Sequence, residues 1–185
     1  GKGTISRALL RDYPTMVLSV SATSRPSRSG EQDGVHYHFI DKQAFRDMID
    51  DDQFLEWAEV YGNYYGTPRQ FVLDVLGQGR DLILEIDIQG ALQVKDKFPE
   101  SVLIFIAPPS RGELERRLLA RGTDSRQEIQ KRLDCAAGEM KLAARYDYLV
   151  INDEVAGALE KVRAIIAAEK SRPRFFEVFL EQFTR

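Results

Sequence analysis

The first residues of the chain have the composition of the end of a phosphate-binding loop. The sequence opens Gly1-Lys2-Gly3-Thr4 and continues into a predicted helix. Free amide groups and the positive end of the dipole at a helix N-terminus favour a bound phosphate, and a lysine adds a full positive charge. The same tetrapeptide also occurs in ordinary loops, so it indicates a nucleotide site only together with other signals.

A polar loop from Thr23 to Gly34 carries two arginines, Arg25 and Arg28, on either side of the stiffening residue Pro26. The planar guanidinium fork matches the geometry of a phosphate, and two converging forks hold a dianion firmly. This pattern indicates an anion site. The alternative is a loop whose arginines are only solvated.

The aromatic segment from Phe54 to Thr67 contains a candidate for recognising a nucleobase. Guanine presents adjacent N1–H and N2–H donors that one carboxylate accepts together, and its O6 accepts from a hydroxyl. Adenine has no such donor pair, so a carboxylate at this place discriminates against it. Glu56 with Tyr65 and Thr67 therefore favours guanine, whereas simple hairpin packing would also explain the aromatic residues.

A carboxylate and a pair of arginines add to this set. Asp87 lies at the end of the apolar run Leu82–Ile88, and the carboxyl end of a buried strand is where phosphate-loop proteins place a group that manages magnesium. Arg117 and Arg121 share one face of a predicted helix at i, i+4. Paired guanidinium groups of this kind attract anions. The plain alternatives are a solvent-facing carboxylate and surface charges.

The composition excludes several classes of protein. The chain has 185 residues, 43% hydrophobic and 30% charged, which suits one compact body rather than a disordered chain. The 26 Lys and Arg against 29 Asp and Glu give a net charge of -3, which argues against a basic nucleic-acid coat. A single cysteine excludes an intramolecular disulfide, and only two histidines accompany it, which argues against a zinc site.

No apolar run approaches the roughly 20 residues that a membrane helix needs. We therefore expect a cytoplasmic protein that binds neither a membrane nor nucleic acid.

Helical and strand patterns alternate along the chain, which is typical of an α/β protein. Asp41 is a predicted helix N-cap, and residues 54–65 form a predicted hairpin around Gly62-Asn63. Strands are predicted at residues 16–21, 36–40, 82–88, 102–107 and 148–151. Helices are predicted at residues 4–10, 41–49, 68–76, 90–97, 110–121, 125–142 and 155–170. The apolar strands 82–88 and 102–107 flank a helix, so we expect them in one parallel sheet.

The last residues form a predicted amphipathic segment with one face dense in aromatic side chains. Its apolar residues at i, i+3, i+4 spacing are Phe175, Phe176, Phe179, Leu180 and Phe183. We expect a terminal helix docked on its own core. The alternative is a subunit interface, most simply that of a symmetric homodimer, with Pro173 as a hinge.

Together these motifs strongly resemble those of guanylate kinases. The resemblance begins with Ser-x-Ser-x-Thr-x-Arg-x-x-Arg-x-Gly-Glu at residues 19–31 and Tyr-x-Phe at 37–39. It continues with Phe-x-Glu-Trp at 54–57, Gly-Asn-Tyr-Tyr-Gly-Thr at 62–67 and Asp-Ile-Gln-Gly at 87–90. It ends with Ile-Ala-Pro-Pro-Ser at 106–110, Arg-Leu-x-x-Arg-Gly-Thr at 117–123, Arg-Leu at 132–133 and Val-Ile-Asn-Asp at 150–153. The motifs thus cover nearly the whole chain in order.

The resemblance implies a role for each candidate residue. Those implied to surround a guanine base are Ser21, Glu56, Thr67 and Asp87. Those implied to hold the GMP phosphate are Arg25, Arg28, Tyr37 and Tyr65, with Glu31 supporting their loop. Those implied to bind ATP are Gly1, Lys2, Gly3, Thr4, Arg117, Arg121 and Asn152. Those implied to act in catalysis are Lys2, Arg25, Arg117, Arg121 and Arg132.

The resemblance also implies Mg²⁺ as the cofactor that accompanies ATP. The residue after Lys2 is Gly3, where this loop usually has serine or threonine. The hydroxyl contact to magnesium is therefore expected from Thr4, partly through water.

The implied fold is that of a P-loop kinase: a central parallel sheet flanked by helices, with a small mixed-strand GMP-binding domain and a helical lid. The expected core comprises residues 1–24, with its N-terminal part missing, 79–110 and 140–185; the GMP-binding domain comprises 25–78 and the lid 111–139. The implied reaction transfers the γ-phosphoryl group of ATP to GMP or dGMP, giving ADP and GDP. The alternatives are a catalytically inactive guanylate-kinase-like module that binds partner peptides, and a kinase for another phosphorylated substrate.

Overall fold

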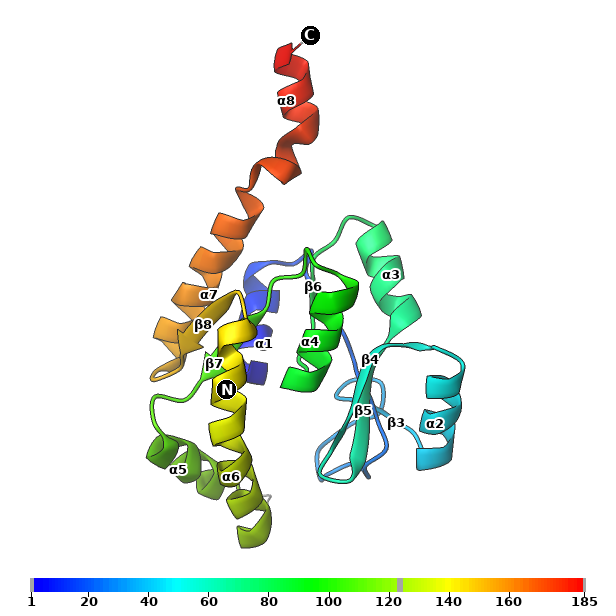
Figure 1. The fold of residues 1–185 in the computed structure, drawn as a ribbon, viewed down its shortest axis with the longest axis vertical. Coiled ribbons are helices and arrows are strands. Elements are labelled where there is room, and N and C mark those ends of the chain that lie inside the picture. Colours follow the sequence, from blue (N-terminus) through cyan, green and yellow to red (C-terminus); the bar gives the residue numbers. More distant parts are fainter. Residues whose placement is uncertain (1, 123–124, 185) are drawn as a thin grey trace.

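The fold is described here from a computed structural model (Figure 1). It covers residues 2–122 and 125–184, with the backbone alone for Arg121 and Thr184. Helices and strands alternate along most of the chain, as the sequence predicts. Within these residues, no helix combines the length and the apolar character needed to cross a membrane.

Four short strands form two parallel pairs in the core. β1 (Val17–Leu18) pairs with β6 (Leu82–Ile83), and β7 (Ile104–Ala107) pairs with β8 (Tyr148–Ile151). Two helices that contact each other lie against these strands: α1 (Lys2–Asp12) and α7 (Val155–Lys170). The buried side chains of this core are Ile5, Leu9, Met16, Val150, Ala158 and Val162.

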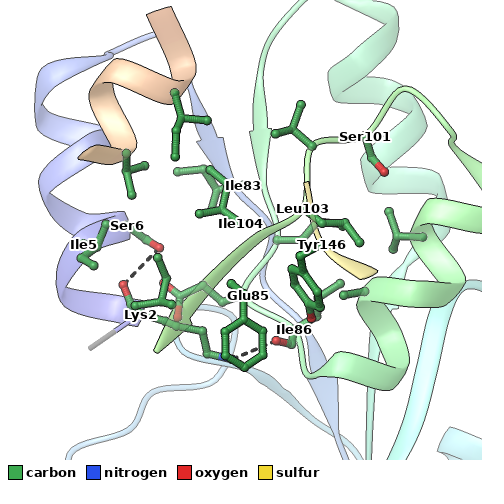
Figure 2. A pocket seen from close by; sticks show the side chains of 18 of the residues that line it. Lys2, Ile5, Ser6, Ile83, Glu85, Ile86, Ser101, Leu103, Ile104 and Tyr146 are labelled. Carbon is green, nitrogen blue, oxygen red and sulfur yellow. Dashed lines mark hydrogen bonds between the residues drawn. The ribbon is translucent and has the colours of Figure 1, made fainter. Parts of the chain in front are cut away.

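A large apolar cavity separates the two pairs of strands. β6 and β7 do not pair with each other within the described residues, and a cavity of about 1140 Å³ lies between them. Ile83, Ile104 and Tyr146 are among the residues that line it (Figure 2). The parallel strands therefore form two pairs rather than one continuous ladder. The strand predicted at residues 82–88 was too long, because no described strand lies beside Leu84–Ile86 on the cavity side.

The second sheet is mixed and has the strand order β3-β2-β5-β4. Its strands are β2 (Ala22–Thr23), β3 (His38–Phe39), β4 (Phe54–Val60) and β5 (Asn63–Pro68). β2 runs parallel to β3 and antiparallel to β5, and β5 runs antiparallel to β4. The predicted hairpin is confirmed, but its turn lies at Tyr61-Gly62, one residue earlier than expected. The register places Glu56 opposite Thr67.

Three helices surround the mixed sheet: α2 (Lys42–Asp50), α3 (Arg69–Gly77) and α4 (Ile88–Lys97). Asp41 caps α2 as predicted, because its side chain accepts from the backbone N–H of Ala44 at 2.8 Å. Phe45 of α2 is fully buried and stacks on Phe54 with ring centroids 4.4 Å apart. This aromatic stack fixes α2 on the sheet.

Two further helices, which we call the helical pair, project from the core: α5 (Arg111–Arg121) and α6 (Arg126–Leu142). Ser110 caps α5, and Gly122 ends it in the left-handed conformation with φ 66°. Ser125 and Glu128 form a capping box at the start of α6. The pair has a small apolar cluster of its own: Leu118, Ile129 and Leu133. A short 3-10 turn, η1 (Ala143–Arg145), follows α6.

The C-terminal segment extends away from the rest of the molecule (Figure 1). It consists of a 3-10 turn, η2 (Pro173–Phe176), and α8 (Glu177–Thr184). Phe179 and Phe183 are 54% and 78% exposed, so the expected docking of this helix on its own core is wrong. Arg174 forms ion pairs with Glu100 and Glu169 and ties the base of the segment to the body.

Candidate functional site

The carboxyl ends of the core strands and the start of α1 form one wall of the site. Lys2, in the first turn of α1, donates from Nζ to the backbone oxygen of Ile86 at 2.8 Å (Figure 2). Thr4 is exposed in the same turn. The ammonium group thus lies at the edge of the cavity, beside the segment that leads to Asp87. Gly1, which was also expected to bind ATP, lies outside the described residues.

Glu85 belongs to the same wall and was missed by the sequence analysis. A Cβ placed on Gly3 would lie 3.4 Å from Glu85 Oε2, so this carboxylate borders the first turn of α1. Figure 2 shows Glu85 near Lys2. No short-range spacing in the sequence signalled this contact, because Glu85 and the first turn of α1 are far apart along the chain.

Glu56 is a buried carboxylate on the facing wall. Its side chain is 3% exposed, and Thr67 Oγ1 donates to its Oε1 at 2.6 Å. Burial raises the pKa of Glu56 to about 7, with a smaller increase from the charge of Asp87, against the hydrogen bonds from Thr67. The structure therefore brings together three of the residues that were expected around the base.

Strand β4 is clamped onto α4 on both sides of Glu56. Gln93 donates from Nε2 to the backbone oxygen of Trp57 at 2.7 Å and accepts from the backbone N–H of Trp57 at 3.3 Å. Lys97 donates from Nζ to the backbone oxygen of Leu55 at 2.6 Å. These bonds fix the position of the carboxylate relative to the first turn of the helix.

Glu56 lies in close contact with α4 at Gly90. A Cβ at this position would lie 2.1 Å from Glu56 Oε2, so any other residue would displace the Glu56 carboxylate from its place beside the helix. Asp87 caps the helix, because its Oδ1 accepts from the backbone N–H of Gly90 at 3.0 Å. Asp87 is therefore a helix cap beside a second carboxylate, and not the end of the long strand that the sequence predicted.

Arg25 is held in place by Glu31 through two parallel hydrogen bonds. Its two terminal nitrogens each donate to a different oxygen of Glu31, both at 2.7 Å. Glu31 also accepts from the backbone N–H of Arg28 at 2.7 Å. The Arg25 hydrogen bonds are the main reason that the pKa of Glu31 is lowered to about 2. The loop is therefore ordered by its own ion pair rather than merely solvated.

Aromatic rings surround the Arg25 guanidinium. Its carbon Cζ lies 5.1 Å from the ring centroid of Tyr37 and 5.7 Å from that of Phe39. The rings of Tyr37 and Tyr65 meet edge to face at 6.0 Å. Four of the residues that were expected at the GMP phosphate therefore converge: Arg25, Glu31, Tyr37 and Tyr65. Ser21, whose backbone oxygen accepts from His38 at 2.9 Å, and the exposed Arg28 belong to the flanking segments.

Arg117 joins the helical pair to the loop after β8. Its Nε donates to Glu113 at 2.6 Å, and its terminal nitrogens donate to the backbone oxygens of Asn152 and Asp153 at 2.8 and 2.9 Å. Asn152 is 3% exposed, and its Oδ1 has no hydrogen-bond partner among the residues described. The expected ATP residues Arg117 and Asn152 are therefore neighbours.

Two further arginines of the helical pair, Arg121 and Arg132, were expected at the site. The Arg132 guanidinium carbon lies 5.6 Å from the ring centroid of Tyr61, at the turn of the β4–β5 hairpin. The side chain of Arg121, which was also expected to bind ATP, lies outside the described part of the structure. The hairpin contact was not foreseen from the sequence.

Comparisons with known proteins agree with this arrangement. The model of the guanylate kinase family matches residues 1–169. Guanylate kinase of Syntrophomonas wolfei is 56% identical over 172 residues, which are 93% of this chain and 88% of that protein. Guanylate kinase of Caldanaerobacter subterraneus is 55% identical over 172 residues, or 93% and 84% of the two chains.

A solved structure is also similar. The crystal structure of guanylate kinase from Anaplasma phagocytophilum has a TM-score of 0.79 and 34% sequence identity, and the match covers 92% of this chain and 82% of that chain. The resemblance seen in separate motifs thus extends to the overall sequence and to the fold. This chain belongs to the guanylate kinase family, whose members are ATP-dependent nucleoside monophosphate kinases.

Proposed function

We propose that Glu56 selects guanine for a reaction in which ATP phosphorylates GMP or dGMP, giving ADP and GDP. The main support is that the carboxylate of Glu56 is buried and accepts a hydrogen bond from Thr67 through one of its oxygens. A carboxylate accepts the N1–H and N2–H pair of guanine, and a buried group left unpaired by adenine discriminates against that base.

An assay of ADP release with GMP, dGMP, AMP and UMP tests this function. Turnover with GMP and dGMP is expected, and equal turnover with AMP would contradict guanine selection by Glu56. Absence of ADP release with all four nucleotides would support the inactive peptide-binding module instead.

The substrate phosphate is proposed to bind at the loop of Arg25 and Arg28, next to Tyr37 and Tyr65. The bidentate contact with Glu31 holds Arg25 in one orientation before substrate arrives. A guanidinium that is already oriented loses little side-chain entropy when an anion binds. Ser21 and Asp87 are proposed to complete the base site.

The ATP phosphates are proposed to bind at the first turn of α1, from Lys2 through Gly3 to Thr4, with Gly1 before them. Arg117, Arg121 and Arg132 of the helical pair are proposed to reach the phosphates from the opposite side, and Asn152 to line the adenine site. We assign residues 111–139 as a lid, 25–78 as the GMP-binding domain and the remainder as the core. Phosphoryl transfer needs little covalent chemistry from the protein, so these cations and the exclusion of water determine the rate.

Mg²⁺ is proposed to accompany ATP at this wall. Mg²⁺ in such sites is held mainly by substrate phosphates and water, with one or two protein oxygens. Thr4, in the first turn of α1, and Glu85, which borders that turn, offer those oxygens. Bound there, the ion would neutralise charge that develops on the phosphates.

Self-association through the C-terminal segment is proposed as a further property of the chain. Its apolar side chains between Phe175 and Phe183 are 45% to 78% exposed, and the segment lies beyond the residues that the family model matches. Six such side chains amount to roughly 600 Å² of surface per copy. Two copies would bury roughly 1,200 Å², which is enough for a specific interface.

Deletion of residues 174–185 tests the homodimer. Loss of the dimer in light scattering, with an unchanged melting temperature, is expected. A monomeric intact chain would contradict self-association, and a lowered melting temperature in the deletion variant would indicate an intramolecular role.

A further inference from the structure

One face of α6 lies toward the other walls of the site. Four of its residues recur at the spacing of a single helical face: Glu128, Arg132, Cys135 and Glu139. The charge of Arg28 reaches Glu128 at one end of this face. The charges of Lys2 and Asp87 reach Glu139 at the other end. The face therefore extends from the side of the Arg28 loop to the side of the start of α1.

The middle of this face meets the side chain of Tyr61 in the GMP-binding half. The Arg132 guanidinium lies over the Tyr61 ring at 5.6 Å. The pKa of Tyr61 is raised, first by burial and then by the Cys135 thiol, with which its hydroxyl interacts. The tip of the β4–β5 hairpin thus touches both central residues of the face.

The backbone of Tyr61 is unusual for an aromatic residue. Its φ is 52°, and that of the following Gly62 is 78°, so both turn residues have left-handed backbone conformations. Asparagine and glycine adopt this conformation easily, whereas a bulky side chain is strained there. The ring is also 49% exposed, so it does not contribute to a buried core of the hairpin. A strained residue with an exposed ring points to a function for the ring itself.

We propose that Tyr61 is a positioning residue. Its ring holds the Arg132 guanidinium between the Arg28 loop and the start of α1, and this contact couples the GMP-binding hairpin to the lid. An aromatic face attracts a guanidinium without removing its charge, so contact with the Tyr61 ring orients the Arg132 cation and leaves it positive. Tyr61 and Glu56 lie on the same hairpin. When this hairpin closes over the base, it would therefore also bring Arg132 toward the γ-phosphoryl group of ATP. This inference rests on the proposed role of Arg132 in catalysis.

Two substitutions separate the ring from the turn. Tyr61→Asn keeps a residue that accepts the left-handed backbone but removes the ring, whereas Tyr61→Phe keeps the ring and removes the hydroxyl. We expect Tyr61→Asn to lower kcat by about tenfold or more, because a misplaced cation loses transition-state contact. We expect KM for GMP to stay within about twofold, since the base and phosphate contacts remain. The melting temperature should not fall, and Tyr61→Phe should retain most of the activity.

A double-mutant cycle tests whether Tyr61 acts through Arg132. In the background of Arg132→Ala, Tyr61→Asn should cause no further loss of kcat. Losses that multiply would overturn the coupling. Wild-type kcat in Arg132→Ala would overturn the proposed role of Arg132 and this inference with it. Loss in Arg132→Ala combined with wild-type kcat in Tyr61→Asn would overturn this inference alone.

The contact itself can be measured without turnover. Trp57, the single tryptophan, lies on the hairpin, and α6 can carry one dye through Lys131→Cys in a Cys135→Ser background. The serine hydroxyl keeps a polar partner for Tyr61, and the kcat of the Cys135→Ser protein must match that of the wild type before the labelled proteins are compared. Energy transfer from Trp57 to this dye, with a bisubstrate analogue bound, should be high and should fall with Tyr61→Asn but not with Tyr61→Phe. Equal transfer in all three proteins would overturn the docking role of Tyr61.

Discussion

If Glu56 holds the base as proposed, its ionisation should couple proton release to the binding of GMP. Burial raises the pKa of this carboxyl to about 7, so a large fraction of the ligand-free protein carries a proton there at neutral pH. Only the ionised form accepts from both N–H groups of guanine. Base binding therefore favours the ionised form and releases a proton, and the affinity for GMP should rise with pH up to the pKa.

Calorimetric titration with GMP from about pH 5.5 to about pH 8.5 should show this dependence, with Kd falling by up to about tenfold per unit below pH 7 and levelling above it. Glu56→Gln should weaken GMP binding by about 2 kcal/mol and flatten the profile, because the substituted amide presents a donor to the N–H pair. Persistence of the step at about pH 7 in Glu56→Gln would contradict the assignment, whereas a step at about pH 6 from the GMP phosphate itself should remain in both proteins. Binding of AMP, measured in parallel, should change little.

Several site residues could be predicted from sequence because short-range spacing places them. Hairpin register brings Glu56 opposite Thr67, and a six-residue separation allows Arg25 to meet Glu31 in one loop. Glu85 and Tyr61 could not be found in the same way. Their partners, the first turn of α1 and the face of α6, are distant in sequence and meet them only in the folded chain.

Helices of this protein were predicted better than its strands, because caps are local and strand pairing is not. Asp41, Ser110 and Ser125 each mark a helix start in the sequence and cap it in the structure. Strand length depends on a neighbouring strand, and the segment Leu84–Ile86 lacks one among the described residues. The predicted docking of α8 was wrong because an apolar pattern shows that a helix face is hydrophobic, but not which surface it contacts.

The capping box of α6 predicts a local effect on the lid. The Ser125 backbone N–H donates to the Glu128 side chain at 2.7 Å, and the Ser125 side chain accepts from the Glu128 backbone at 3.3 Å. Ser125→Ala should destabilise the helix by about 1 kcal/mol. Because α6 buries only Ile129 and Leu133, we expect amide exchange in α6 to accelerate by about fivefold, with little change in the global melting temperature.

Ser110→Ala is the matched control for this experiment. Ser110 accepts from the Glu113 backbone at 3.1 Å and caps α5, so its removal should accelerate exchange in α5 first. Uniform acceleration of both helices by either substitution would show that the helical pair opens as one unit, contrary to the local effect predicted for Ser125.

The molecule as a whole is expected to contract when both nucleotides bind. The proposed lid at residues 111–139 has a small apolar cluster of its own, and the cluster of the proposed GMP-binding domain at residues 25–78 takes in only Ala22 from outside those bounds. We therefore expect both parts to move as bodies relative to the core. Small-angle scattering should show a smaller radius of gyration with a bisubstrate analogue than without it. An unchanged radius with the analogue bound would argue against closure.

The exposed C-terminal segment has a consequence for the handling of the protein. Its apolar side chains between Phe175 and Phe183 are 45% to 78% exposed, and Arg174 ties its base to the body. Exposed terminal segments are preferred sites of proteolytic cleavage. Brief digestion with chymotrypsin should therefore cut after these phenylalanines first and leave the body intact. Cleavage should slow as the protein concentration rises, because the proposed interface between two copies would cover the same side chains.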